Sequence, residues 1–177
     1  NFMIGPRVVS NIAFPNGKIS DAGADSFKPP ASTGRLATYS CKLAKLMDKL
    51  SRAKGTVFIY SNFKEYGGLR TVCMALDAAG WTHFMGVAGP RQYAVWSGDT
   101  PRDQRSEMRR VFSDRGNTGG KMLKIILGSP SIKEGVTFKN CRNVFVLDLH
   151  WNWSRMLQVI GRASRHCSHA DLPPEKR

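Results

Sequence analysis

Residues 40–63 read SCKLAKLMDKLSRAKGTVFIYSNF, and this stretch indicates the class of fold. Its first half repeats apolar residues at the three- and four-residue spacing of one helix face, at Leu43, Leu46, Met47 and Leu50. Gly55 ends this pattern, and the apolar run from Thr56 to Tyr60 has the length and composition of a strand buried on both faces. The stretch therefore predicts a helix that leads into an internal strand.

The same alternation continues toward the C-terminus. A helix is predicted around Leu69 to Ala79, and another at Thr100-Pro101, where Thr suits the N-cap and Asp103 completes a capping box. Apolar runs predict strands at 93–96, 123–127 and 143–147, and Asn152 can cap a last helix. The alternation predicts an α/β, three-layer domain with a mainly parallel sheet and helices on both faces.

The N-terminal segment differs in composition from the rest. Residues 1–35 are rich in Gly and Pro, so we expect an irregular arm or interdomain linker before a domain at 36–177. Within this arm, Arg7 to Phe14 is predicted to form a hairpin across Asn16-Gly17. Since the chain does not begin with Met, we expect it to be part of a longer protein.

The charge balance favours a polyanionic partner. Lys and Arg number 27 against 13 Asp and Glu, which gives a net charge of +14. Interleaved aromatic residues make nucleic acid the first candidate, while no sequence signal predicts a membrane partner. Charge that serves only solubility is the alternative.

The cysteines predict neither a disulfide framework nor a metal site. They include no CxxC pair, and the His-Cys-His group at 166–169 has no second cluster at ligand spacing. We therefore expect reduced thiols in an intracellular compartment at Cys41, Cys73, Cys141 and Cys167.

The segment QVIGRASR at 158–165 carries the most specific functional signal. If it is helical, one face gathers Gln158, Gly161, Arg162 and Arg165. The anchoring face, about 140° away, gathers Trp153, Met156, Leu157 and Ile160. Glycine inside a helix costs about 1 kcal/mol relative to alanine, so we expect a close approach at Gly161. A solvated basic face is the alternative.

Polar turns follow three of the predicted strands. They are Ser61-Asn62-Phe63, the run GSPSIKEGVTF at 128–138 and the run DLHWNW at 148–153. In an open α/β sheet ligands bind at the carboxyl ends of the strands, and hydroxyl groups and backbone amides there suit phosphate oxygens.

A complete site for nucleotide hydrolysis is absent from the sequence. The phosphate-binding pattern GxxxxGK[ST] does not occur, because Gly119-Gly120-Lys121 is followed by Met122 and Gly17-Lys18 by Ile19. No acidic cluster ends a strand. We therefore expect the chain to supply arginines to a nucleotide without hydrolysing it unaided.

Together these motifs resemble those of a known family. Over roughly residues 36–170 the chain resembles the second, C-terminal RecA-like domain of superfamily 2 helicases and translocases. QVIGRASR is similar to the QxxGRxxR motif, VFIYSNF at 57–63 to the fourth motif, WSGDTPRDQRSEMRRVF at 96–112 to the segment after it, and GSPSIKEGVTF to the fifth. The runs at 129–138 and 150–173 most resemble helicase-like ATPases of nucleocytoplasmic large DNA viruses, of the nucleoside triphosphatase I and early-transcription-factor large-subunit types.

The resemblance implies roles for particular residues. Arg162 and Arg165 match arginine fingers that reach the γ-phosphate of ATP, bound with Mg2+ on a first domain, and Gln158 would position them. Further contacts to the nucleotide are implied for Glu134, Gly135 and Gly161. Contacts to the nucleic-acid backbone are implied for Ser61, Asn62, Ser129 and Lys133, although Pro130 departs from many family members.

The implied function is that of the second motor domain of an ATP-dependent helicase or translocase, inactive when isolated. Its implied partners are nucleic acid, DNA before RNA, a first helicase domain in the same parent chain and viral transcription machinery, in the virion and host cytoplasm. Two alternatives remain: a non-catalytic nucleic-acid-binding module and a scaffold in a viral transcription complex.

Overall fold

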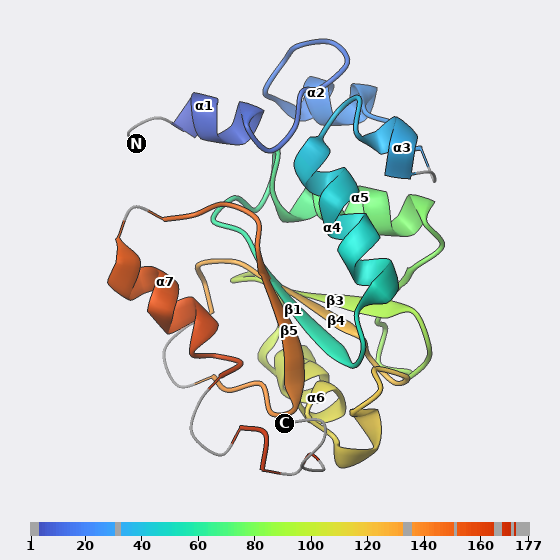
Figure 1. Cartoon of the computed structure of the whole chain (residues 1–177), viewed down its shortest axis with the longest axis vertical. Helices are drawn as coiled ribbons and strands as arrows, with labels where there is room; N and C mark the ends of the chain where they lie inside the picture. The colour runs from blue at the N-terminus through green and yellow to red at the C-terminus, as the bar shows by residue number, and fades with distance from the viewer. Residues whose placement is uncertain are drawn as a thin grey trace.

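The computed structural model describes residues 4–30, 33–132, 136–150, 152–164, 168–170 and 172. Its centre is a five-stranded sheet in which every strand pairs in parallel, in the order β2-β3-β4-β1-β5 (Figure 1). The strands are β1 (Thr56–Tyr60), β2 (Thr82–His83), β3 (Gln92–Trp96), β4 (Ile125–Gly128) and β5 (Cys141–Val146). The predicted parallel α/β fold is confirmed.

Helices cover both faces of this sheet, as the alternating side chains of β1 require. Val57 and Ile59 belong to a core built with α4 (Cys41–Arg52) and α5 (Leu69–Ala78). Phe58 belongs to a second core, built with α6 (Arg102–Phe112) and α7 (Trp153–Ile160). The described residues therefore form the three predicted layers (Figure 1).

An aromatic cluster fills the core beside α6. The ring centroid of Phe138 lies 5.1 Å from that of Phe58 and 5.6 Å from those of Trp96 and Phe112. Phe138 is fully buried, and its N–H donates to the carbonyl oxygen of Arg162 at 2.9 Å. The ring thus anchors the segment after β4 and the segment after α7 to the same core.

Two of the predicted helices form as expected. The apolar face of α4 is buried, and the Ser40 hydroxyl caps the helix by accepting from the Leu43 N–H at 2.9 Å. The α5 helix stops before Gly80, whose φ of +78° suits a glycine.

The start of α6 differs from the prediction. Thr100 does not act as the N-cap, because its hydroxyl donates to the Val95 carbonyl at 3.0 Å and accepts from the Ser97 N–H at 3.1 Å. These bonds close the turn after β3, and the helix begins at Arg102. After α6, a short 3-10 helix, η1 (Arg115–Asn117), leads toward β4.

The N-terminal segment is helical, and the predicted hairpin is wrong. The segment contains α1 (Ile4–Val9), α2 (Asp21–Ser26) and α3 (Thr33–Leu36). The Gly17 N–H does donate to the Phe14 carbonyl at 2.9 Å, but Pro15 occupies the second position of that turn. Proline fixes φ near −65°, which excludes the left-handed turns that join hairpin strands.

This segment also contributes to the domain core. Phe14 and Phe27 are buried in the core beside α4 and α5. Their rings pack edge to face with centroids 6.1 Å apart. In Figure 1 the three short helices lie along the same end of the molecule as α4 and α5. The described part of the arm is therefore packed, while its role as an interdomain linker stays a prediction.

Candidate functional site

The three polar turns lie side by side at one edge of the sheet. Because β1 pairs with β4 on one side and β5 on the other, the segments that follow these strands leave at the same edge. The Ser61 N–H donates to the Gly128 carbonyl at 3.1 Å, and the Leu147 N–H donates to the Tyr60 carbonyl at 2.9 Å. These bonds extend the strand pairing into the turns.

Asp148 holds two of the turns together. Its carboxylate is buried, and it accepts from the Ser61 hydroxyl at 2.6 Å and from the Asn62 N–H at 2.8 Å. The Asn62 side-chain amide donates in return to the Asp148 carbonyl at 3.2 Å. A carboxylate away from water needs such donors in place of its hydration shell. The turn after β1 is therefore fixed to the segment after β5.

The N-terminal segment extends this network. The Asn11 amide donates to the Asp148 carboxylate at 3.4 Å, and an Arg7 guanidinium nitrogen lies 3.9 Å from the same carboxylate. Arg7 also donates to the Leu149 carbonyl at 3.2 Å and stacks over the Phe63 ring at 5.1 Å. Neither residue could be predicted as part of the site, because more than 130 positions separate each of them from Asp148.

The side chains predicted to contact nucleic acid differ in exposure. Ser61 is fully buried, and Ser129 is 4 % exposed with its hydroxyl 2.6 Å from the Ser131 hydroxyl. Asn62 is half-buried at the surface. The Ser61 hydroxyl is bonded to the buried Asp148 carboxylate in this conformation, and its contact to nucleic acid stays a prediction.

The α7 helix presents the predicted Gln158, and its buried face overlaps the predicted one only in part. Asn152 caps it, as predicted, by accepting from the Arg155 N–H at 3.2 Å. Met156 and Val159 are buried, whereas the predicted anchors Trp153 and Leu157 are 66 % and 51 % exposed. The prediction was correct for Met156 and wrong for Trp153 and Leu157, because apolar spacing alone does not say which of two overlapping apolar stripes meets the sheet.

The QVIGRASR segment is helical only in its first part. The α7 helix ends at Ile160, and bonds from Arg162 N–H to Val159 O (3.1 Å) and Ala163 N–H to Ile160 O (3.1 Å) continue it as a tighter turn. At Gly161 the nearest atom to an added Cβ is the Leu157 carbonyl oxygen, at 3.0 Å. Among the described residues, the close neighbour of this glycine is its own helix rather than another segment.

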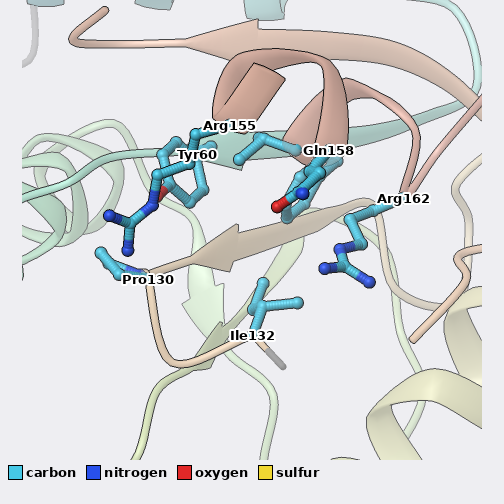
Figure 2. Close-up of a pocket in the computed structure, with 8 residues that line it drawn as sticks. Tyr60, Pro130, Ile132, Arg155, Gln158 and Arg162 are labelled. Atoms are coloured by element: carbon cyan, nitrogen blue, oxygen red, sulfur yellow. The ribbon is translucent and has the colours of Figure 1, made fainter. Parts of the chain in front are cut away.

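A pocket of about 560 Å³ lies between α7 and the turn after β4. Figure 2 shows Arg155 at one end, Arg162 at the other and Gln158 between them. The side chain of Arg162 is buried, since only 6 % of the residue is exposed. The remaining lining is Phe58, Tyr60, Pro130, Ile132 and Val159. The pocket thus combines two guanidiniums and an amide with mostly apolar walls.

The electrostatics of the site follow from this arrangement. Burial raises the pKa of the Tyr60 hydroxyl, and the neighbouring Arg155 charge opposes part of that shift. Desolvation lowers the pKa of His150, and the positive charges of Arg155 and Arg7 lower it further. The Nδ1 atom of His150 accepts from the Asn152 N–H at 3.0 Å, as a neutral imidazole can.

Four predicted site residues, Lys133, Glu134, Gly135 and Arg165, lie outside the described residues. In the part of the chain that is described, no group of three or more His, Cys, Asp or Glu side chains is placed to hold a metal ion. None of the described helices has the length and apolar composition that a membrane span requires. Cys41, Cys73 and Cys141 are free thiols.

The parallel sheet, the layered helices and the strand-end pocket define a RecA-like α/β domain. The sequence profile of the family described as helicase conserved C-terminal domain matches residues 41–167. The chain belongs to this family.

Relatives of the chain come from large DNA viruses. Protein R563 of Acanthamoeba polyphaga mimivirus, which carries the name of an ATP-dependent RNA helicase, is 42 % identical over 100 % of this chain and 31 % of its own length. An early transcription factor large subunit homolog of African swine fever virus is 27 % identical over 86 % of this chain and 16 % of its own length. Nucleoside triphosphatase I of Heliothis armigera entomopoxvirus is 27 % identical over 80 % of this chain and 20 % of its own length.

These comparisons confirm the family resemblance stated from the motifs. The chain spans less than a third of the length of each of these relatives. A crystal structure of the C-terminal part of the Fun30 ATPase domain matches with a TM-score of 0.55 at 20 % identity, covering 73 % of this chain and 38 % of that chain. The likeness establishes the shared fold.

Proposed function

We propose that this chain is the second motor domain of an ATP-dependent helicase or translocase. In this proposal, ATP and Mg2+ bind mainly on a first domain, and this chain supplies Arg162 and Arg165 to the γ-phosphate. A fixed guanidinium neutralises charge on the transferring phosphoryl group and is worth about 10³ to 10⁵ in rate in related nucleotide hydrolases.

The observation that supports this proposal best is the placement of Arg162. Its guanidinium is buried but faces a pocket that Gln158 also lines. The hydrogen bond from the Phe138 N–H to the Arg162 carbonyl fixes the backbone at that point. A cation held in this way loses little conformational freedom when an anion binds, which is what a catalytic arginine requires. We also propose that Gly161, at the end of α7, and the residues Glu134 and Gly135 contact the nucleotide.

We further propose that the strand-end turns hold the nucleic-acid backbone. Asn62 lies half-buried at the surface, and its side-chain nitrogen carries a second N–H besides the one that donates to the Asp148 carbonyl. Ser129, in the turn after β4, and Lys133 would supply the second contact. The net charge of +14 favours such a partner. The name of R563 refers to RNA, whereas the motif resemblance implies DNA before RNA, so both polymers enter the test.

The test requires a protein that joins this chain to a first motor domain. Arg165→Ala and Arg162→Lys are expected to reduce nucleic-acid-stimulated ATP hydrolysis by at least about 10³-fold with little change in ATP binding. ATPase rates would be measured without polymer and with single-stranded DNA, duplex DNA and RNA. Arg109→Ala, an exposed arginine on α6, removes the same charge as a control. Near-normal turnover in both finger variants would exclude the arginine-finger role.

A second function is favoured by the early transcription factor relative. In that case the domain would be a non-catalytic module or scaffold in a viral transcription complex. It would bind nucleic acid or polymerase without any dependence on ATP. The finger variants would then leave every measured property of the protein unchanged.

A further inference from the structure

We propose that Arg155 is a phosphate-binding residue of the pocket beside α7, acting together with Arg162 at its opposite end. The identity of the ligand, a nucleotide or a nucleic acid, rests on the proposed function. The anion affinity itself can be measured without any ATP hydrolysis.

Arg155 shares one side of the α7 segment with Gln158 and Arg162. The three residues are spaced at i, i+3 and i+7, which places side chains along one line of a helix and its continuing turn. All three line the pocket, and Figure 2 shows the Arg155 guanidinium beside Pro130 and Tyr60 at the end opposite Arg162. A ligand that fills the pocket would therefore meet a positive charge at each end.

The guanidinium of Arg155 is available for a ligand. Arg155 is exposed, and it forms no ion pair with a carboxylate in the described parts of the chain. Other surface arginines are paired there: Arg70 with Asp21 at 2.8 Å and Arg110 with Glu107 at 2.6 Å. The bond that ties Arg155 to the Asn152 side chain uses only its backbone N–H.

The walls of the pocket favour an anion with a less polar body. Phe58, Ile132 and Val159 are buried and apolar, so they reduce the water available to screen the two charges. The Tyr60 hydroxyl is directed to the Asn62 side chain, to which it donates at 3.1 Å. A phosphate group can accept two parallel, charge-assisted hydrogen bonds from a guanidinium. A neutral carboxamide or hydroxyl group on a ligand would bind the guanidinium more weakly.

Phosphate can reach the pocket from two sources, a nucleotide or a nucleic-acid backbone, and binding assays distinguish them. The 177-residue chain would be titrated with inorganic tripolyphosphate and with fluorescein-labelled single-stranded DNA and RNA of 20 nucleotides, at several salt concentrations. Arg155→Ala is expected to weaken at least one of these interactions about tenfold, as the loss of one charge-assisted contact would. If the backbone is the source, the slope of log Kd against log salt also falls by about 0.7.

Two further variants complete the experiment. Arg155→Lys is expected to recover part of the lost affinity, because it restores the charge but not the paired donors. Arg109→Ala, matched in charge, exposure and helical setting, is expected to change each Kd less than twofold. Loss confined to tripolyphosphate supports a nucleotide source, and loss confined to the oligonucleotides supports a backbone source. Equal effects of Arg155→Ala and Arg109→Ala, or no binding of any probe by the unaltered chain, would overturn the proposal.

Discussion

The hydroxyl of Ser61 donates to the carboxylate of Asp148 at 2.6 Å, joining two residues that are 87 positions apart. Ser61 directly follows β1, and Asp148 lies in the segment after β5, so this single bond ties the ends of two neighbouring strands. Both side chains are buried. The bond therefore sets the relative position of the turn that carries Asn62 and the segment that leads into α7.

Removing the Asp148 carboxylate should destabilise the domain. Asp148→Ala leaves the Ser61 hydroxyl and the Asn62 N–H without their acceptor, so the free energy of unfolding is expected to fall by about 2–4 kcal/mol. Asp148→Asn keeps the shape and should cost less. Urea unfolding followed by circular dichroism measures both. The exposed Asp103→Ala serves as the control, and an equal loss in that variant would contradict the role of Asp148.

The titration of His150 should report on the charge of Arg155. The pKa of His150 is expected below its ordinary value of 6.5, first because of desolvation and then because of Arg155 and Arg7. The folded state therefore favours the neutral imidazole, whereas His150 in the unfolded chain takes up a proton near its ordinary pKa of about 6.5. As the pH falls below about 6.5, the unfolded state binds more protons than the folded state, and the free energy of unfolding decreases. NMR titration of the imidazole protons would locate the midpoint. In Arg155→Ala the midpoint of His150 should rise but stay below 6.5, because desolvation and Arg7 still lower the pKa. An unchanged midpoint would show that the charge of Arg155 does not act on His150.

The half-buried thiol of Cys73 and the buried thiol of Cys141 should resist modification. Burial raises the pKa of Cys73 to about 12 and that of Cys141 to about 12, so neither forms much thiolate at pH 8. Cys41 is exposed and should react quickly with a disulfide reagent. In a Cys167→Ser background, one thiol is expected to react in the folded chain and three after unfolding. Rapid reaction of all three without denaturant would show that the core opens readily.

Adding a methyl group at Gly128 should disturb the pocket. A Cβ at this position would lie 2.6 Å from a ring carbon of Phe58, a contact that forces the fully buried ring to move. Gly128→Ala is expected to lower the free energy of unfolding by about 1–3 kcal/mol. Gly34→Ala, in α3, meets no atom within 4 Å and is the matched control. The stability of the two variants would be compared by thermal unfolding. If Gly128→Ala destabilised the domain no more than Gly34→Ala, a steric conflict between a Cβ at Gly128 and the Phe58 ring would be excluded.

The sequence allowed the sheet and its main helices to be predicted, because their apolar periodicities are local. The stripe of α4 and the apolar run of β1 lie where expected. The two-residue strand β2, with both residues exposed, carries no such pattern and was missed. The N-terminal helices were missed for a different reason, since they are short and Phe14 and Phe27 pack into a core that is built largely by residues distant in sequence.

The candidate site was predicted in outline only. Gln158 and Arg162 do line one pocket, since a helix and a tighter turn keep residues four apart on nearly the same side. Arg155 lies before the motif QVIGRASR and was not predicted. Its position three residues before Gln158, on the same side of a helix, is the signal that could have indicated it. The bond that holds Ser61 beneath the surface could not be predicted, because it depends on a carboxylate contributed by the segment after β5.

Arg7 contacts two segments of the molecule at once: the Phe63 ring after β1, and the Asp148 carboxylate and the Leu149 carbonyl after β5. Loss of α1 from its place would remove the Arg7 contacts to the turn after β1 and to the segment after β5, so we expect α1 and these segments to unfold locally as one unit. Their amide protons should consequently exchange with solvent at a common rate. A protease that removes the first residues would then loosen the Asn62 turn without cutting near it.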